Sequence, residues 1–391
     1  MKEDTSVDVH PVVHWTEDGA AHSARFRSER GSPPPRCVVI ADDRMTADAA
    51  YGLACQGTAL LWRGDFQNAR QMLLGLANRA DRHPRKPKES AASTTPASPV
   101  EVFNLLRQAR SQRARTLGML LVPLDANFGI PLRRAPDIRQ ACAETYGPGE
   151  GPSVASLREL LGLIGAHEWR IKGIEIPAIG GRIHPHYGVF APVRREYVEL
   201  VANAPLPALT SSNSPAFDIG TGTGILAAVL ARRGFRRVIA TDVDPRALAC
   251  ARENLERLGL ARQVEVVQAD LFPEGRAALA VCNPPWIPAR PSSPIEHGIY
   301  DPASRMLRGF LGALPMHLAP GGEGWLILSD LAEHLGLRTR SELLAAFDAA
   351  GLKVLERSDV RPKHPRVSDQ TDPLHAARAA EVTSLWRLAV R

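Results

Sequence analysis

The sequence predicts an α/β fold with a mostly parallel sheet in the second half of the chain. Short apolar runs alternate with helical patterns there, which is typical of a parallel sheet covered by helices on both faces. A glycine-rich segment, Gly220 to Gly224, follows the first run, and Asn283-Pro284-Pro285-Trp286 ends the fourth. The two segments therefore lie at the carboxyl ends of strands, where open parallel sheets bind ligands.

Length and composition indicate two domains of ordinary globular character. The chain has 391 residues, of which 44% are hydrophobic and 23% charged. No apolar run approaches the roughly 20 residues that span a bilayer, so we expect a cytoplasmic protein that does not contact a membrane. The five cysteines lack the Cys-x-x-Cys spacing of zinc or redox sites, so neither a metal site nor a disulfide framework is expected.

The positive charge mildly favours an anionic partner such as RNA. The net charge is +6 and the pI about 9.3. The excess is concentrated between Arg79 and Arg139, where twelve Lys and Arg residues stand against five Asp and Glu residues. A solvated helix face followed by a basic linker explains the same pattern.

The composition along the chain predicts three segments. Residues 1–35 mix charges with Ser, Gly and a run of three prolines, which indicates a flexible arm. Residues 36–175 are expected to form a mostly helical accessory or substrate-recognition domain, with a linker-like stretch near 84–99. Helical patterns are expected over 41–80, where Leu60 and Leu61 fit one helix face, over 100–117 and over 156–164, and 119–122 could be a short strand. Residues 176–391 are expected to form the catalytic domain.

Seven strands are expected in the catalytic domain. Apolar runs place them at 216–219, 238–241, 264–268, 278–282, 325–328, 354–357 and 384–389. Helices are expected between them, one of which begins at Pro245 because proline is well tolerated in a first turn. The last two strands are joined by a long basic loop, 358–381, whose contact with substrate is left open.

The glycine segment has the features of a cofactor loop. Glycine lets the backbone approach a ligand closely, and the following helix begins with exposed N–H groups. The third glycine comes one residue earlier than in the Gly-x-Gly-x-x-Gly fingerprint of dinucleotide oxidoreductases, so a cofactor without a pyrophosphate fits better. The candidate cofactor residues here are Asp218, Gly220, Thr221, Gly222, Thr223 and Gly224.

Acidic residues end the next two strands. Asp242 can accept hydrogen bonds from both hydroxyls of a ribose. Asp244 is the alternative ligand, although its place before Pro245 also suits a helix cap. Asp270, followed by Leu271, can reach an adenine amino group or can be a solvated loop residue.

The segment Asn283 to Trp286 has the chemistry of an acceptor site. Two prolines end the strand and stiffen the backbone on both sides. The Asn283 side-chain oxygen and the Pro284 carbonyl can then each accept one hydrogen of an NH₂ group. Trp286, after Pro285, offers a flat face on which a planar acceptor could stack.

These segments together resemble the class I methyltransferases, specifically the methyltransferase small group with its HemK-like glutamine N5-methyltransferases and RNA adenine or guanine N-methyltransferases. The resemblance covers roughly residues 180–335 and implies a Rossmann-like seven-stranded sheet with S-adenosylmethionine as cofactor. The glycine loop looks like the family's cofactor loop, Asp242 like its ribose-binding acid, and 270–272 like its adenine-side segment. Asn283 to Trp286 is similar to its Asn-Pro-Pro-Tyr/Phe motif, which places Asn283 near both cofactor and acceptor.

The flanking segments add to the resemblance. Residues 189–192 and 199–201 look like the strand and helix that precede the cofactor loop in HemK-like enzymes. Glu296 and residues 300–307 are similar to the loop that follows the acceptor motif.

Two other groups of residues were considered as sites. His184 and His186 could suggest a metal pair, but they lack an acidic or Cys partner at ligand spacing, so no metal is expected. Arg182 and Arg194 could guide an anionic substrate or be simply solvated.

The sequence thus predicts an S-adenosylmethionine-dependent N-methyltransferase that acts on a macromolecule. A glutamine amide in a translation-related protein is slightly preferred, and a base in structured rRNA or tRNA is the alternative. A non-catalytic RNA-binding scaffold that keeps the fold is a further alternative.

Overall fold

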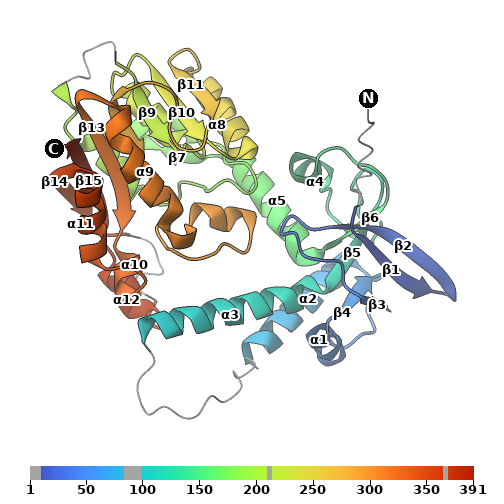
Figure 1. The fold of residues 1–391 in the computed structure, drawn as a ribbon. Helices are drawn as coiled ribbons and strands as arrows, with labels where there is room; N and C mark the ends of the chain where they lie inside the picture. The colour runs from blue at the N-terminus through green and yellow to red at the C-terminus, as the bar shows by residue number, and fades with distance from the viewer. Residues whose placement is uncertain (1–9, 83–97, 209–213, 364–368) are drawn as a thin grey trace, which may run out of the picture. The chain divides into compact units, whose positions relative to one another are not determined.

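The computed structural model describes residues 10–82, 98–208, 214–363 and 369–391, and it divides into two compact units (Figure 1). The N-terminal unit contains the described residues of 1–96 and 104–167. The C-terminal unit contains those of 97–103 and 168–391. Most of the linker-like stretch predicted near 84–99 lies outside the described residues.

The N-terminal unit is built on a six-stranded mixed sheet with the order β1-β2-β6-β5-β4-β3. Its strands are β1 (Val12–Glu17), β2 (Ala20–Arg27), β3 (Cys37–Ala41), β4 (Thr58–Trp62), β5 (Leu120–Leu124) and β6 (Ser153–Ser156). Strands β3, β4 and β5 run parallel, and β6 pairs antiparallel with β5. Leu61, Leu121 and Val154 pack together in its core.

Among the described residues, five helices belong to this unit wholly or, for α3 and α5, for most of their length. They are α1 (Ala47–Cys55), α2 (Phe66–Arg82), α3 (Pro99–Gly118), α4 (Arg139–Tyr146) and α5 (Leu157–Lys172). The helices predicted before Ala80, after Val100 and after Ser156 are therefore present, and they hold more residues than the strands do. Of the six strands only β5 matches a predicted strand, the short one at 119–122, and the sheet as a whole was not predicted. β4 was predicted as part of a helix, because Leu60 and Leu61 fit one helix face.

The prediction of a flexible arm over residues 1–35 is wrong for residues 12–27. β1 and β2 form an antiparallel hairpin in register from Val12↔Arg25 to Glu17↔Ala20. The turn uses Asp18 and Gly19, both with positive φ, which suits a tight two-residue hairpin. The polar, weakly alternating sequence of β2 hides its strand character, since half of its residues are exposed.

The C-terminal unit contains the predicted seven-stranded, mostly parallel sheet, with the order β11-β10-β9-β12-β13-β15-β14. Its strands are β9 (Ala216–Ile219), β10 (Val238–Asp242), β11 (Val264–Gln268), β12 (Ala277–Cys282), β13 (Leu318–Ser329), β14 (Leu352–Val360) and β15 (Thr383–Val390). Only β15 runs antiparallel to its two neighbours, β13 and β14. The predicted α/β fold class, with a seven-stranded, mostly parallel Rossmann-like sheet, is confirmed for this unit.

The register brings the two predicted functional segments side by side. β12 pairs directly with β9, with Leu279 opposite Ala216 and Cys282 opposite Ile219. Gly220 and Asn283 are the next residues of these two strands. The glycine loop and the acceptor segment therefore leave neighbouring strands at the same edge of the sheet.

Helices cover both faces of this sheet. On one face lie α6 (Glu196–Asn203), α7 (Ile225–Arg232) and α8 (Pro245–Arg257), which share a buried cluster with Trp325. On the other face α9 (Arg305–His317) and α11 (Arg340–Ala349) pack against Phe217. The apolar residues of β9, and those of β12 from Leu279 to Cys282, alternate between the two clusters, as expected for strands buried on both faces.

Short elements complete the unit. They are β7 (Ile174–Ile176), η1 (Pro177–Ile179), β8 (Gly181–Ile183), η3 (Pro294–Gly298), η4 (Pro302–Ser304), α10 (Leu331–His334) and α12 (His375–Ala380). The basic loop expected at 358–381 contains the end of β14 and all of α12. Among the described residues of both units, the helices are too short or too polar to cross a bilayer.

Candidate active site

The glycine loop turns sharply between β9 and α7. Gly220, Gly222 and Gly224 have φ angles of 73°, 54° and 81°, a region that other residues enter at a cost. A Cβ on Gly220 would lie 2.4 Å from the Met306 methyl, and one on Gly224 would lie 3.2 Å from Ala251. A Cβ on Gly222 would meet no atom within 4 Å, so this glycine faces open space. The loop therefore has room for a ligand at Gly222.

Asp218 stabilises the glycine loop through two hydrogen bonds. Its Oδ2 accepts hydrogen bonds from Thr221 Oγ1 at 2.7 Å and from the backbone N of Ala227, in the first turn of α7, at 2.9 Å. The carboxyl group is buried, and burial raises its pKa to about 6. Asp218 thus ties the loop to the helix. Thr223 is buried as well, and its carbonyl accepts from Asn254 Nδ2.

Asp242 ends β10 beside the loop. Its Oδ2 accepts from Gly222 N and its Oδ1 from Asp244 N, each at 3.0 Å. Burial raises its pKa, and these backbone bonds oppose the shift. Each oxygen keeps acceptor capacity, so the carboxylate can still receive two hydroxyls. Asp244 caps α8 by accepting from Arg246 N, which is the alternative role considered for it.

Asp270 lies two residues beyond the end of β11, close to the strand end predicted from the sequence. Its side chain is 56% exposed and makes an ion pair of 2.5 Å with Arg305. The next residue, Leu271, has a φ of 74°, and its carbonyl accepts from Thr241 Oγ1. The backbone here is fixed, whereas the Asp270 carboxylate is solvated and paired.

The acceptor segment is fixed by a contact that the sequence did not indicate. The indole N–H of Trp286 donates to Asn283 Oδ1 at 2.9 Å. Asn283 is half-buried, and Pro284 is buried between it and Pro285. An amide oxygen has two lone pairs, so Asn283 keeps one for a further donor.

Trp286 does not present the open face expected of it. The guanidinium of Arg194 lies over the ring, 5.5 Å from its centroid. The ring also packs against the buried clusters on both faces of the sheet. A planar acceptor would have to displace Arg194 to stack on that face.

The loop after the acceptor segment returns to the glycine loop. Ile287 N bonds Ile299 O, and Asp301 N bonds Ile287 O, which closes the loop on itself. The buried Asp301 carboxylate accepts from the backbone N of Met306 and of Leu307, at the start of α9. Met306 is thereby held over Gly220, and the start of α9 is joined to both functional segments.

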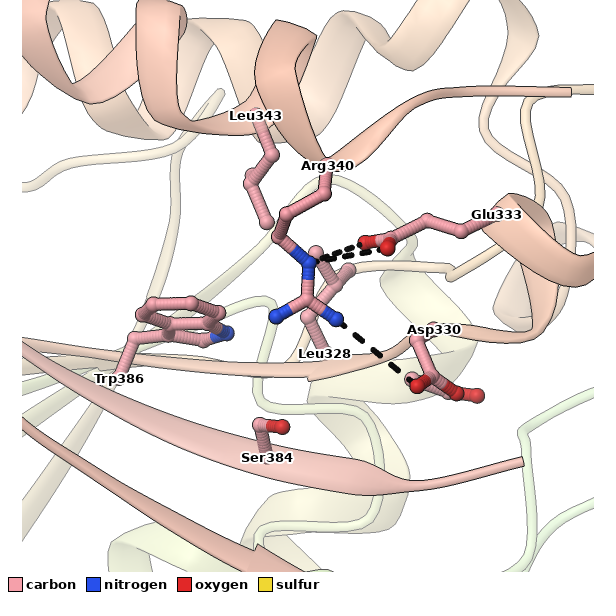
Figure 2. Close-up of a pocket in the computed structure, with 8 residues that line it drawn as sticks. Leu328, Asp330, Glu333, Arg340, Leu343, Ser384 and Trp386 are labelled. Atoms are coloured by element: carbon pink, nitrogen blue, oxygen red, sulfur yellow. Dashed lines mark hydrogen bonds and ion pairs between the residues drawn. The ribbon is translucent and has the colours of Figure 1, made fainter. Parts of the chain in front are cut away.

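A shallow hollow lies at the end of β13, the next strand along this edge (Figure 2). Arg340 crosses it with its Nε 2.9 Å from Glu333 Oε2 and its NH2 3.8 Å from Asp330 Oδ2. The guanidinium also lies 5.3 Å from the ring centroid of Trp386. The guanidinium of Arg340 is thus already paired with protein groups. We therefore interpret the hollow as a structural feature beside the candidate site.

His184 and His186 serve structural contacts. His184 Nδ1 lies 2.6 Å from the Arg170 carbonyl, and His186 Nε2 lies 2.7 Å from Glu253 Oε2. Glu253 also pairs with Arg170 and Arg257, and these partners lower its pKa to about 2. Within the described ranges, no group of three or more His, Cys, Asp or Glu residues is arranged to hold a metal ion.

Comparison with known families identifies the central part of this unit. Residues 181–331 match the family model described as methyltransferase small domain. This segment is a methyltransferase small domain. The match spans the glycine loop, Asp242 and the acceptor segment, which is the region of the resemblance noted in the sequence.

Curated relatives that match this domain are named as methyltransferases. The chain is 40% identical over 146 residues to "Ribosomal protein L11 methyltransferase" of Pelotomaculum thermopropionicum, a match that covers 37% of this chain and 39% of the relative. It is 34% identical over 171 residues to "Release factor glutamine methyltransferase" of Cereibacter sphaeroides, over 40% of this chain and 60% of the relative. The matches thus span only part of each relative's length.

A solved structure of related name is also similar. It is the "ribosomal protein L11 methylase" of Lactobacillus delbrueckii subsp. bulgaricus, with 16% identity, a TM-score of 0.34, and coverage of 52% of this chain and 83% of that one. At this TM-score the likeness adds nothing to the strand order described above.

The methyltransferase domain has the features needed to hold its cofactor. Methyltransferase small domains use S-adenosylmethionine. The space open at Gly222 and the acceptor capacity of Asp242 suit a nucleoside without phosphates. The residues at this place are therefore compatible with the cofactor predicted from the sequence.

The sequence did not indicate the residues that support these groups. Each of these residues comes from a segment distant in sequence from the group that it supports. Arg194 lies over the Trp286 ring, Met306 lies beside Gly220, and Thr241 donates to the Leu271 carbonyl. A pattern read along the chain cannot pair them. For Arg194 the only signal was its position shortly before the glycine loop.

Proposed function

We propose that the protein is an S-adenosylmethionine-dependent N-methyltransferase whose acceptor is the side-chain amide of a glutamine in a translation-related protein. The observation that carries the proposal is the pairing of β12 with β9, which places Asn283 beside the glycine loop. A methyl donor and a planar nitrogen held by these two segments would be neighbours.

The acceptor segment suits a nitrogen that is a poor nucleophile. The lone pair of an amide is delocalised into its carbonyl group. The free lone pair of Asn283 Oδ1 and the Pro284 carbonyl would each accept one N–H and turn the nitrogen lone pair out of the amide plane. When bound, S-adenosylmethionine supplies an electrophilic methyl group. Positioning of this kind lowers a barrier by up to roughly 7–11 kcal/mol.

The names of the relatives support a protein acceptor. One is named for ribosomal protein L11 and another for release factor glutamine. The cover of Arg194 on Trp286 also favours an amide over a nucleobase, because a base gains much of its binding energy from stacking. A base in rRNA or tRNA remains the alternative, and the separation of labelled products distinguishes the two.

The decisive experiment supplies the purified protein with S-adenosylmethionine labelled in its methyl group and an extract of cells that lack the gene. We expect label in a protein fraction, on a nitrogen that acid hydrolysis releases as methylamine. Label in RNA would replace the glutamine proposal by the base alternative. No label in either fraction would favour the scaffold.

Asn283→Ala tests the catalytic role of the acceptor segment. Loss of one preorganised hydrogen-bonding group typically costs about a hundredfold or more in kcat, so we expect a loss of that order with unchanged cofactor affinity by calorimetry. Asn203→Ala is the control, since Asn203 is exposed on α6 and its side chain donates to the Glu199 carbonyl of the same helix. Equal activity of the two variants would contradict the proposal.

A further inference from the structure

Trp286 has a polar function in this structure as well as an apolar one. Its indole N–H is the donor that holds Asn283 Oδ1 at 2.9 Å. The amide of an asparagine can rotate about its last side-chain bond, and a single directed donor is enough to select which end carries the oxygen. A phenyl or phenol ring at position 286 has no N–H at this place.

Arg194 holds the indole in turn. Its guanidinium lies over the ring at 5.5 Å from the centroid, which is within the range of a cation–π contact. Its NH1 donates to Glu381 Oε1 at 2.7 Å. The side chain of Arg194 is 21% exposed, whereas that of Glu381 is fully buried.

Glu381 is itself fixed to the sheet. Ser329 Oγ, at the end of β13, donates to the same Oε1 at 2.8 Å. Next to it, Val382 N donates to Asp330 Oδ1, and Asp330 N donates to the Val382 carbonyl. The carboxylate is therefore anchored at the same edge of the sheet as Asn283.

The contacts form one continuous series across four segments that are distant in sequence. Ser329 and Glu381 hold Arg194, Arg194 covers Trp286, and Trp286 bonds Asn283. The negative charge of Glu381 also offsets that of Arg194, so the guanidinium adds little repulsion toward a cationic methyl donor.

We infer that Arg194, anchored by Glu381, and Trp286 are positioning residues that orient the acceptor oxygen of Asn283, and that this arrangement selects a primary amide rather than a stacked base. This inference rests on the proposed function. Trp286 acts as a hydrogen-bond donor whose ring is clamped, and Arg194 keeps its charge away from the substrate.

Trp286→Phe is the first test, because it keeps an aromatic ring and removes the N–H. On the labelled fraction identified above, we expect kcat to fall about tenfold while the KM for S-adenosylmethionine stays within twofold. Unchanged kcat would overturn the inference even if methyl transfer itself is established.

Arg194→Gln and Arg194→Lys separate the clamp from simple charge. Arg194→Gln removes the cation from the ring and should lower kcat about threefold to tenfold, since a cation–π contact of this kind has that size. Arg194→Lys keeps a cation but loses the flat guanidinium, so its kcat should lie between those of the wild type and Arg194→Gln. In the Trp286→Phe background, where the N–H is absent, the same changes should have little further effect. Arg195→Gln is the matched control, because Arg195 is the exposed neighbour on the chain. An equal loss of kcat in Arg195→Gln would contradict the proposed coupling of Arg194 to Asn283 through Trp286. Fully additive losses of kcat in the double variants would also contradict it.

A third measurement does not depend on activity. In ¹⁵N-labelled protein, the indole N–H signal that disappears in Trp286→Phe is assigned to Trp286. We expect this proton to exchange slowly with solvent in the wild type and at least tenfold faster in Asn283→Ala. Fast exchange in the wild type would contradict the hydrogen bond between Trp286 and Asn283. Slow exchange without any methyl transfer would support the positioning of Asn283 and contradict only the proposed function.

Discussion

At the scale of single residues, Asp218 shows how a buried charge supports the cofactor loop. Both of its hydrogen bonds end on the same oxygen, Oδ2. An asparagine oxygen could accept both bonds equally well. Asp218 was predicted as a cofactor residue, and the structure gives it a supporting contact with the loop itself.

Asp218→Asn should change how stability depends on pH. Burial raises the pKa of the native carboxyl from 3.8 to about 6. The stability that this raised pKa contributes is fully present below pH 3.8 and is lost as the pH rises through 6. The unfolding free energy of the wild type relative to Asp218→Asn should therefore fall between pH 4 and 6, by roughly 2–3 kcal/mol. Urea unfolding at several pH values measures this difference, and a flat difference would contradict the burial argument.

Gly222→Ala should weaken cofactor binding more than it lowers the stability of the fold. A methyl group at a positive φ costs about 1 kcal/mol in stability, and here it also enters the open space above the loop. Gly259→Ala is a matched control, with a φ of 70° and no atom within 4 Å of the added Cβ. We expect similar losses of stability in both variants and at least a tenfold loss of S-adenosylmethionine affinity only in Gly222→Ala, measured by calorimetry.

At the scale of elements, helix α11 has a complete capping box. The Thr339 hydroxyl accepts from Glu342 N at 3.1 Å, and the Glu342 carboxylate accepts from Thr339 N at 2.7 Å. Thr339→Ala should lower the unfolding free energy by about 1 kcal/mol, whereas Thr339→Ser should retain most of it. Chemical denaturation of the two variants checks this, and equal losses would show that the hydroxyl is not what stabilises the helix.

Sequence patterns predicted the elements of the methyltransferase domain well because its central strands are buried on both faces. Continuous apolar runs such as 278–282 leave little ambiguity. The hairpin of β1 and β2 was missed since half of its strand residues are exposed and many are polar. β4 was missed for the opposite reason, because a short apolar run fits a helix and a strand equally well.

The candidate site was predictable only where its chemistry is local in sequence. The glycine loop and the acceptor segment are contiguous, so their residues could be named. The contacts of Arg194 with Trp286 and Glu381 join residues that are up to 187 positions apart. Such pairs depend on the order of the strands, which local patterns do not specify.

At the scale of the whole molecule, each unit has its own buried core. Leu60→Ala, in β4, should destabilise the N-terminal unit by about 2–5 kcal/mol. S-adenosylmethionine affinity should change less than twofold, since the glycine loop and Asp242 belong to the C-terminal unit. Hydrogen exchange followed by mass spectrometry would locate the faster-exchanging peptides, and faster exchange in β9 or β12 would contradict independent cores.

The place of β15 in the sheet has a consequence for biosynthesis. This strand is made after β14, yet it lies between β13 and β14 and supplies all the ladder bonds of β14. While the chain is being translated, β14 therefore has no edge to join until residues 383–390 have left the ribosome. Premature termination a few codons earlier would leave two unpaired strand edges, which are sites for aggregation rather than for slow completion of the fold.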